Sequence, residues 1–495
     1  MNIILQVSGL EKIREVDERL ISYNIEMAEV TGGNFWKEFT PEQIAGTEEF
    51  PSMEDWSKMG ELLQPFPSID LYNKKLRKLA SALGPVWIRV SGGWANKVYY
   101  DLDGKMNGQI PVGFESVLTE EQWKGVLDFV KEMGAKLLVS VSNTEGIHKA
   151  KEPWHPKQAK ILFEYSKNYG VPISAVEFCN EPNLMQFFGF KDEYAAEDFS
   201  RDQNIFLEWM RKEYPDVLVV GPATAGDSES GTKESGGIGA TKGLKELSVR
   251  SLMENAKEPL DIYSFHCYNG VSERAALMGG HWSADTVLSE EYLAVAPNAI
   301  IGNMPARDKY TSSGKIWVTE SADGGCGGNT WASTYLDVFR TANELGAFAT
   351  LTDGVIFHNT LASSDYGFLK RQTYEPRPNY WFVLLWNRLM GTTVYDSKIE
   401  VCEGAHVYAH SRRDGKDGVS YLVINNSKTE DTIVSFSKSV EVYRLSADNP
   451  RATTMKLNGK ELILGENNEL PDMAPEREET GEVILAPMTI VFIVM

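Results

Sequence analysis

Eight apolar, strand-like runs alternate with amphipathic helix patterns over about 370 residues. Two of the helix patterns, 119–134 and 155–170, end in glycine, a common helix stop. This alternation predicts a (β/α)₈ barrel. An open doubly wound sheet is the alternative, but the count of eight and the lack of a phosphate-binding turn favour the barrel. The strand-like runs are 20–27, 86–92, 136–142, 173–179, 217–224, 261–268, 315–321 and 347–358.

Beyond Gly391 the pattern changes to short alternating strands separated by turn signals such as Asp414-Gly415 and Asn458-Gly459. It predicts a β-sandwich of about 100 residues. Residues 1–16 also show a weak alternation of apolar and polar side chains, and they precede the first barrel strand. We therefore expect them to join the sandwich. The predicted division is therefore a catalytic barrel at 17–391 and a β-sandwich domain made of 1–16 plus 392–495. A Gly/Ser-rich stretch at 221–243 predicts a flexible rim after the fifth strand.

The formal net charge is −21, from 49 basic and 70 acidic residues. This charge argues against nucleic acid or an anionic membrane as a partner. Cys179, Cys267, Cys326 and Cys402 lack paired spacing and are typical of free thiols in a reducing compartment. The first residues show no signal-peptide pattern. We expect a cytoplasmic protein, or a secreted one if the start has been processed or engineered.

Two glutamates follow strand-like runs and are candidates for chemistry. The run 173–178 leads into Asn180-Glu181-Pro182, and proline cannot continue a strand. Glu320 ends the run 315–320 and precedes four glycines in five positions, 324–328, where backbone can approach a ligand closely. Such carboxylates would lie across the same barrel mouth, and glycoside hydrolysis needs such a pair. Either glutamate alone could instead be a helix cap or a surface ion-pair partner.

These motifs resemble those of a known family. Asn180-Glu181-Pro182 and Thr319-Glu320-Ser321-Ala322 are similar to the acid/base and nucleophile motifs of glycoside hydrolase family 79, the heparanase-like and β-glucuronidase enzymes of clan A. The resemblance covers close to the whole chain. It includes WIRVSGGWAN (87–96), FHCYNG (265–270), YGFL (366–369), EPRPNYWFVLLWNRLMG (375–391), and the LNGKEL and LAPMTIVFIV segments of the sandwich.

The resemblance implies a retaining mechanism with Glu181 as general acid/base and Glu320 as nucleophile, their carboxyl groups about 5–5.5 Å apart. It also implies that Asn180 contacts the sugar 2-hydroxyl and that Glu26 binds a ring hydroxyl. Catalysis then requires that burial and the charge of Glu320 raise the pKa of Glu181.

Three further residues are expected to support the pair. Arg89, just before Ser91-Gly92-Gly93, and Tyr268 would keep Glu320 ionised. His266 and Tyr268 alternate on one strand and so point the same way. Arg89 could instead pair with a surface acid, and His266 and Tyr268 could belong to the core.

In this family the glucuronate carboxylate is bound by tyrosine hydroxyls and by backbone amides after the nucleophile. Tyr366 and the amides of Cys326 and Gly327 match those places. The chain departs from the family at Asp323-Gly324-Gly325-Cys326, where a tyrosine is common, and at Trp94 and Cys267. An acid such as Asp323 would repel a substrate carboxylate unless it points away.

The function expected from these features is an exo-acting β-glucuronidase acting on a glucuronide or a glucuronic-acid-containing saccharide. The alternatives are a heparanase-like endo-β-glucuronidase, a neutral β-glycosidase of the same clan, and a carbohydrate-binding protein with an inactive barrel. The presence of Glu181, Glu320 and Asn180 counts against the last of these. No His/Cys/Asp cluster has metal-ligand spacing, so we expect no metal and no cofactor. The sequence leaves the oligomeric state open.

Overall fold

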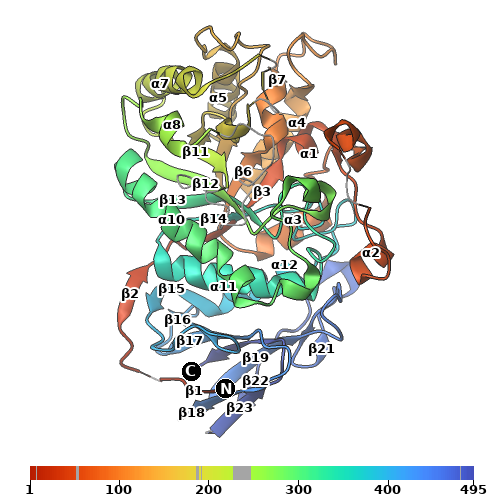
Figure 1. The fold of residues 1–495 in the computed structure, drawn as a ribbon, viewed down its shortest axis with the longest axis vertical. Coiled ribbons are helices and arrows are strands. Elements are labelled where there is room, and N and C mark those ends of the chain that lie inside the picture. The colour runs from red at the N-terminus through yellow and green to blue at the C-terminus, as the bar shows by residue number, and fades with distance from the viewer. Residues whose placement is uncertain (7, 52–54, 186–188, 191, 227–246, 480) are drawn as a thin grey trace.

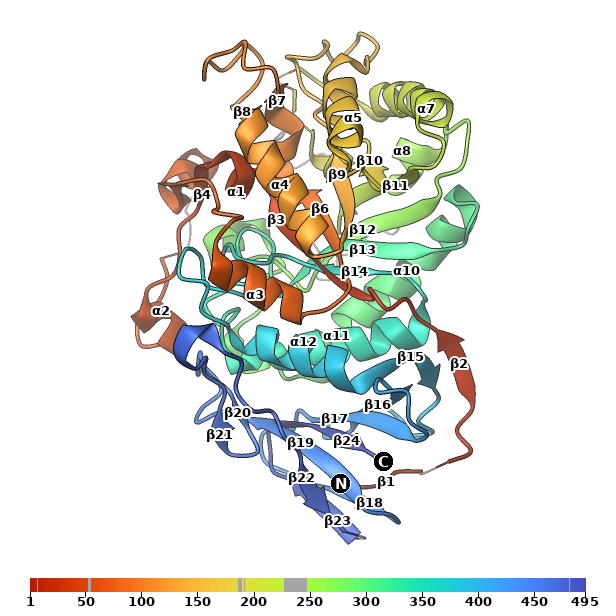
Figure 2. The ribbon, with the colours of Figure 1, turned by 180° about the vertical axis from the view of Figure 1, so that it is seen from behind.

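The computed structural model describes residues 1–495 except 7, 52–54, 186–188, 191, 227–246 and 480. Figures 1 and 2 show a barrel surrounded by helices at the top of the view and layered sheets at the bottom, with both chain termini among the sheets. Most of the predicted flexible rim, from residue 227 to 243, lies outside the described residues. In the described part of the chain, no helix is both long and apolar enough to cross a membrane.

Eight parallel strands close into the barrel, which confirms the predicted (β/α)₈ fold. They pair in chain order, and the last strand returns to the first. The strands are β3 (Ile21–Glu26), β6 (Trp87–Ser91), β9 (Lys136–Ser140), β10 (Ala175–Glu177), β11 (Leu218–Ala225), β12 (Ile262–Tyr268), β13 (Ile316–Ala322) and β14 (Ile356–His358). The α-helices are α1 (Met27–Thr31), α2 (Pro41–Ala45), α3 (Lys74–Ala82), α4 (Glu120–Glu132), α5 (Lys157–Tyr169), α7 (Ala196–Glu213), α8 (Val249–Met253), α9 (Glu290–Leu293), α10 (Val295–Tyr310), α11 (Tyr335–Leu351) and α12 (Pro378–Leu389).

The eighth strand is shorter than the apolar run that predicted it. Residues 347–351 of that run end helix α11, and only Ile356–His358 is a strand. The prediction was wrong there because every α11 residue from Tyr335 to Ala349 is buried. A helix buried on every side does not show alternating apolar and exposed polar faces, so the mostly apolar residues 347–351 look like part of a buried strand.

Two small sheets add to the loops of the barrel. Strand β4 (Gly33–Trp36) pairs with β5 (Leu63–Phe66), and β7 (Val98–Asp101) pairs with β8 (Ser116–Thr119). Both follow barrel strands on the side where the strands end, so they extend the wall of the barrel mouth.

The C-terminal strands form two sheets, and strands β1 and β2 from the N-terminus belong to them. We call these two sheets the sheet domain. A three-stranded sheet has the order β1-β18-β23, and a nine-stranded sheet has the order β2-β15-β16-β17-β24-β19-β20-β21, with β22 paired to β19. Their bounds are β1 (Asn2–Ile4), β2 (Lys12–Glu15), β15 (Met390–Tyr395), β16 (His406–Arg412), β17 (Val419–Asn425), β18 (Thr432–Phe436), β19 (Val440–Ser446), β20 (Lys456–Leu457), β21 (Lys460–Glu461), β22 (Glu476–Glu478), β23 (Gly481–Leu485) and β24 (Thr489–Val494).

The N-terminal strands join this domain, as predicted. Strand β1 pairs in parallel with β18, and β2 pairs antiparallel with β15. Ile3, Val434 and Val483 of the smaller sheet and Val407 and Val423 of the larger one belong to one buried cluster. The domain boundaries at residues 16 and 391 stay a proposal.

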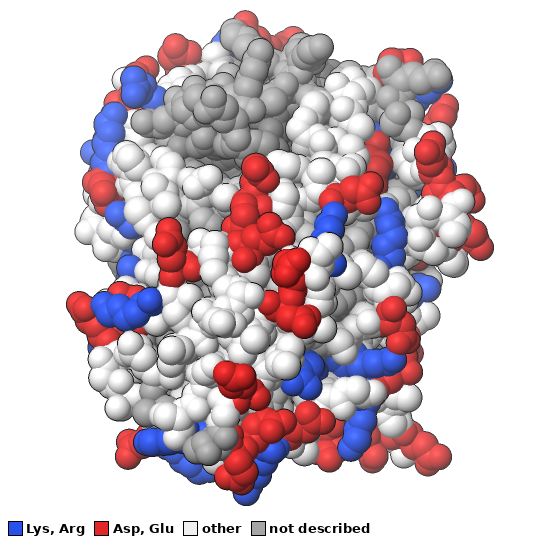
Figure 3. Space-filling model, turned by 60° about the horizontal axis from the view of Figure 1, so that its bottom comes forward, with Lys and Arg blue, Asp and Glu red and all other residues white. Residues whose placement is uncertain are grey.

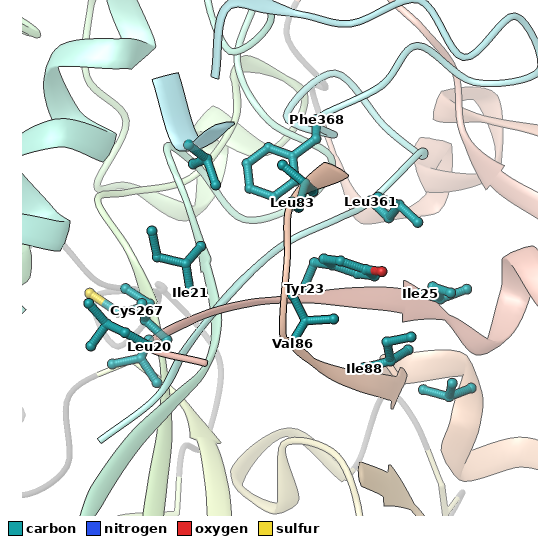
Figure 4. Close-up of a cluster of buried hydrophobic side chains, with 14 of the residues drawn as sticks. Leu20, Ile21, Tyr23, Ile25, Leu83, Val86, Ile88, Cys267, Leu361 and Phe368 are labelled. Atoms are coloured by element: carbon teal, nitrogen blue, oxygen red, sulfur yellow. The ribbon is translucent and has the colours of Figure 1, made fainter. Parts of the chain in front are cut away.

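The barrel core also fixes a loop at the mouth. Figure 4 shows Tyr23 and Ile25 of β3 near Leu361 and Phe368, which belong to the loop after β14. The Leu361 amide donates to the Asn24 carbonyl at 2.8 Å. Burial of each such apolar side chain stabilises the fold by about 1.5–3 kcal/mol. The loop that carries Tyr366 is therefore anchored on both sides by the core.

Candidate active site

Glu320 lies within β13, two residues before the strand ends, and not at its end as the sequence predicted. Phe265 of β12 pairs with Val318 and His266 pairs with Glu320, so Thr319 is an extra residue in the ladder. Such a bulge redirects the side chains next to it. The strand therefore continues past Glu320 while its carboxylate turns toward the barrel mouth.

Three side chains approach the Glu320 carboxylate. Arg89 Nη1 donates to Oε1 at 2.8 Å, and the Tyr268 hydroxyl donates to Oε2 at 2.6 Å. His266 Nδ1 lies 3.4 Å from Oε2. Burial alone would raise the pKa of Glu320, but His266, Arg89 and the Tyr268 hydrogen bond together hold it below its ordinary value. Glu320 is therefore ionised at neutral pH.

Glu181 lies four residues beyond the short strand β10, at the start of the 3₁₀ turn Pro182–Leu184. Its φ of 46° is in the left-handed region, which is uncommon for a residue with a side chain. Its Oε1 lies 2.9 Å from His266 Nδ1. Burial raises the pKa of Glu181, and the Glu320 charge adds to this rise although His266 opposes it.

His266 connects the two carboxyl groups. Its Nε2 lies 3.3 Å from Arg89 Nη2, and a guanidinium can only donate. Nδ1, on the other side of the ring, faces the Glu181 carboxyl group at 2.9 Å. One oxygen from each of Glu181 and Glu320 lies within 4.8 Å of the other and of His266. The two glutamates are thus close enough to act on the same bond.

A buried carboxylate that the sequence reasoning missed completes the centre. Glu177, the last residue of β10, accepts from Arg89 Nε at 3.0 Å and Nη2 at 2.8 Å, and from the Ser140 hydroxyl at 2.6 Å. Arg89 thus bridges Glu177 and Glu320 within the buried interior. The signal in the sequence is a charged residue inside an otherwise apolar strand, which needs a buried partner.

The side-chain oxygen of Asn180 is hydrogen-bonded within the protein. Its Oδ1 accepts from Arg89 Nη2 at 2.8 Å and from the Ser91 hydroxyl at 3.2 Å. Asn96 donates to its carbonyl at 2.8 Å and accepts from its amide at 2.9 Å, so the backbone is fixed as well. Its Nδ2 is buried and has no hydrogen-bond partner among the described residues. That amide is left with two donors for a ligand.

Glu26 ends β3 and is buried. Burial, followed by the charges of Glu320 and Glu29, raises its pKa well above the ordinary value. Its Oε2 has no partner among the described side chains and backbone, and it lies 1.5 Å from where a Cβ on Gly92 would be. Only glycine at 92 leaves room for this carboxyl group.

The glycine loop after Glu320 presents two adjacent backbone amides. The amides of Gly325 and Gly328 donate to backbone carbonyls, whereas those of Cys326 and Gly327 have no acceptor in the described part of the chain. Cys326 and Gly327 have φ of 65° and 89°. Two adjacent amides without acceptors can both donate to one anionic group. A Cβ on Gly327 would come within 2.8 Å of Trp36, which explains the glycine there.

Tyr366 is brought to the same centre by a residue that was not predicted. Asn359 Nδ2 donates to the Tyr268 hydroxyl at 2.8 Å and to the Tyr366 hydroxyl at 3.2 Å. Asn359 follows β14, where nothing in its sequence context distinguishes it. The structure therefore brings together all ten predicted site residues: Glu26, Arg89, Asn180, Glu181, His266, Tyr268, Glu320, Cys326, Gly327 and Tyr366.

Asp323 turns away from this centre. Its Oδ2 accepts from the amide and the side-chain Nδ2 of Asn329, both at 2.8 Å. Burial and the neighbouring Asp337 raise the pKa of Asp323 to about 8. It is therefore largely uncharged at neutral pH, and the repulsion expected from its sequence position is removed.

Glu181, His266 and Glu320 also form the one group of described residues whose donor atoms are close enough to hold a metal ion. The Arg89 guanidinium already lies 2.8 Å from Glu320, and a cation there would be repelled by it. The expectation of a site without metal stays a prediction.

A parallel eight-stranded barrel with a buried glutamate pair at its mouth defines this chain as an O-glycoside hydrolase. The family model described as "Glycosyl hydrolase family 79, N-terminal domain" matches residues 56–229. This match confirms the resemblance to glycoside hydrolase family 79 that the motifs of the chain indicated.

Relatives align along most of the chain at low identity. Heparanase-like protein 1 of Arabidopsis thaliana is 24% identical, with 86% of this chain and 85% of that protein covered. Hyaluronoglucuronidase of Hirudo nipponia is 24% identical over 86% of this chain and 90% of its own. Baicalin-beta-D-glucuronidase of Scutellaria baicalensis is 23% identical, with 86% of this chain and 84% of that protein covered.

Among solved structures, a 4-O-alpha-L-rhamnosyl-beta-D-glucuronidase from Fusarium oxysporum 12S has a TM-score of 0.66 at 11% identity, with both chains fully covered. This likeness shows a shared fold.

Proposed function

We propose that the chain is an exo-acting β-glucuronidase that cleaves terminal β-linked glucuronic acid by double displacement. One observation carries the proposal. Buried Glu181 and Glu320 have carboxyl oxygens within 4.8 Å of each other, and their pKa values are shifted in opposite directions. Two backbone amides without acceptors among the described residues lie in the loop after Glu320. The names of the two curated glucuronidase relatives support a glucuronide as the substrate.

The geometry supports a role for each glutamate. Ionised Glu320 attacks the anomeric carbon while protonated Glu181 gives its proton to the leaving oxygen, which forms a covalent glycosyl-enzyme. Glu181, now ionised, takes a proton from water, and the water oxygen displaces Glu320. The short separation of the carboxyl groups favours this retaining route, because an inverting enzyme needs about 6.5–9.5 Å to hold a water between them.

The same geometry supports recognition of the glucuronate. The amides of Cys326 and Gly327 and the Tyr366 hydroxyl offer hydrogen bonds to the sugar carboxylate, and uncharged Asp323 does not repel it. Asn180 Nδ2 is available for the 2-hydroxyl, and Glu26 for a ring hydroxyl. Cys326 is half-buried and the other residues of this set are buried, and hydrogen bonds from such groups to a charged ligand are strong.

Surface charge supports exo-cleavage over cleavage within a sulfated polymer. Figure 3 shows acidic side chains across the middle of one face, with basic ones between them and toward the edges. With a net charge of −21, long-range attraction for a sulfated chain is weak. We also propose a cytoplasmic location, which the four free cysteines support.

The test compares hydrolysis of an aryl β-glucuronide with that of the matching aryl β-glucoside, with Glu320→Gln as the inactive control. We expect a strong preference for the glucuronide that disappears in the variant. Equal or reversed preference, with the variant inactive, would keep the mechanism and replace the substrate by a neutral β-glycoside. Activity of the wild type on neither compound would contradict the exo-glucuronidase.

The stereochemistry tests the mechanism separately. The first sugar released should have the β configuration when the reaction is followed by proton NMR, before mutarotation. An α product would exclude double displacement.

A further inference from the structure

A cavity of about 730 Å³ lies between the barrel and the sheet domain. Glu38, Ser333 and Arg377 line it from the barrel side, and Arg451 and Thr454 line it from the sheet domain. None of the ten site residues lines it. Its volume is within the range of small-molecule sites, which occur preferentially at domain interfaces.

The cavity carries a local excess of positive charge. Of its seven charged residues, Asp365 is paired with Arg274 at 2.6 Å, and Lys75 is paired with Glu375. The remaining charges are those of Lys370, Arg377 and Arg451 against that of Glu38. Three cations facing one acid is unusual in a chain with a net charge of −21. The excess favours an anionic ligand.

Arg377 is the most buried of these cations, at 8% exposed. Its Nη1 donates to the carbonyls of Ser364, Asp365 and Gly367 at 2.6, 2.9 and 3.2 Å. Its Nε and Nη2 have no hydrogen-bond partner among the described residues. A guanidinium has five donors in a planar fork, and the unused ones suit a carboxylate.

Two other polar atoms of the cavity wall lack partners. The Ser333 hydroxyl, on a residue 3% exposed, and Glu38 Oε1 are buried without a hydrogen bond to the described part of the chain. A buried polar atom without a partner is costly, so such atoms mark places that a ligand or water fills. Ser333 and Glu38 could bond the hydroxyls of a sugar, as could Thr453 and Thr454, which also line the cavity.

Helix α12 begins at the same wall. Its N-cap is Arg377, which caps no amide with its side chain, and Trp381 of its first turns lines the cavity. The positive end of the helix dipole therefore adds to the charge of Arg377.

We propose that this cavity is a second binding site, separate from the catalytic centre, for a saccharide that carries a carboxylate, such as a uronate residue. The cations take the carboxylate, and the hydroxyls and Glu38 take the sugar hydroxyls. The inference goes beyond the proposed hydrolysis and does not require it.

Isothermal titration of the inactive Glu320→Gln chain tests the proposal. The probe is an unsulfated tetrasaccharide of alternating glucuronate and N-acetylglucosamine. We expect two molecules per chain, one at the barrel mouth and one in the cavity. Adding Thr454→Trp, which fills the cavity from an exposed position, should leave one. Adding Thr429→Trp, at an exposed position of the sheet domain that does not line the cavity, should leave two.

Lys370→Glu gives a second readout that does not depend on filling the cavity. It should weaken the second site about tenfold or more and leave the first unchanged. The uncharged N-acetylglucosamine tetrasaccharide should not occupy the cavity. Two molecules bound to the Thr454→Trp chain, or one molecule bound equally by every variant, would overturn the proposal. A single molecule bound by Glu320→Gln and lost with Thr454→Trp would support the cavity site and count against the proposed function at the mouth.

Discussion

Strand β13 and the turn after strand β10 place two glutamates in contrasting surroundings. Glu320 lies within a continuous strand and receives hydrogen bonds from Arg89 and Tyr268. Glu181 lies beyond a three-residue strand, in a left-handed conformation, with His266 as its partner. Both are buried, so burial cannot explain why their pKa values shift in opposite directions. The number and charge of the donors decide which carboxyl group is ionised.

The largest effect on activity is expected from replacing Glu320, the ionised glutamate. Glu320→Gln keeps the shape of the side chain but cannot attack carbon, so kcat on aryl β-glucuronides should fall by about 10⁴-fold or more with any leaving group. An unchanged melting temperature would show that the fold is kept. Activity within about a hundredfold of the wild type would mean that Glu320 is not the nucleophile.

Replacing the protonated member should give a loss that depends on the leaving group. In Glu181→Gln, kcat/KM should fall by about 10²–10⁴-fold for an alkyl glucuronide, whose leaving oxygen needs a proton. It should fall far less for a dinitrophenyl glucuronide, whose leaving group departs as an anion. Equal losses for both substrates would contradict the role of Glu181 as acid.

A smaller change weakens the contrast without removing either glutamate. Activity requires ionised Glu320 and protonated Glu181, so it should be lost at low pH as Glu320 gains a proton and at high pH as Glu181 loses one. The Tyr268 hydrogen bond lowers the pKa of Glu320. Tyr268→Phe should therefore move the acid limb of the kcat/KM profile upward by about one to two pH units, the equivalent of a hydrogen bond to a charged group.

Tyr366→Phe is the matched control for this profile, because the Tyr366 hydroxyl bonds to Asn359 and not to Glu320. It should raise KM for the glucuronide and leave the acid limb in place. If both variants moved the limb equally, the Tyr268 bond would not be the cause.

The smallest effect concerns stability. Asp323, three residues after Glu320, has its pKa raised to about 8 from an ordinary value of 3.8. A carboxyl group with a raised folded-state pKa costs stability as pH rises from about 4 to about 8, by up to about 1.4 kcal/mol per pH unit. The melting temperature of Asp323→Asn minus that of the wild type should grow across this window and then level off.

Asp308→Asn, at an exposed position next to Arg307, serves as the comparison for removal of a surface carboxylate. The melting temperature of Asp308→Asn minus that of the wild type should change little with pH. A flat difference for Asp323→Asn as well would show that Asp323 is ionised in the folded protein.

The fold could be predicted because parallel barrel strands are buried on both faces and appear as continuous apolar runs. The same property made the prediction wrong at the end of α11, because this helix is also buried on every side and its last residues resemble a strand. In the site, Pro182 and the glycine run marked both glutamates. Glu177 and Asn359 could not be found this way, because their partners Arg89 and Tyr268 lie 88 and 91 residues away and meet them only when the barrel closes.

The pairing of β1 with β18 has a consequence for synthesis of the chain. Residues 2–4 are synthesised more than 400 residues before their partners at 433–435. At about 5–20 residues per second, this interval lasts about 20 to 90 s. The first segment must wait through that time with its backbone groups unpaired, as an open strand that other nascent chains can capture. Its exposed, charged neighbours Glu11, Lys12 and Glu15 would discourage such capture until the sheet domain is complete.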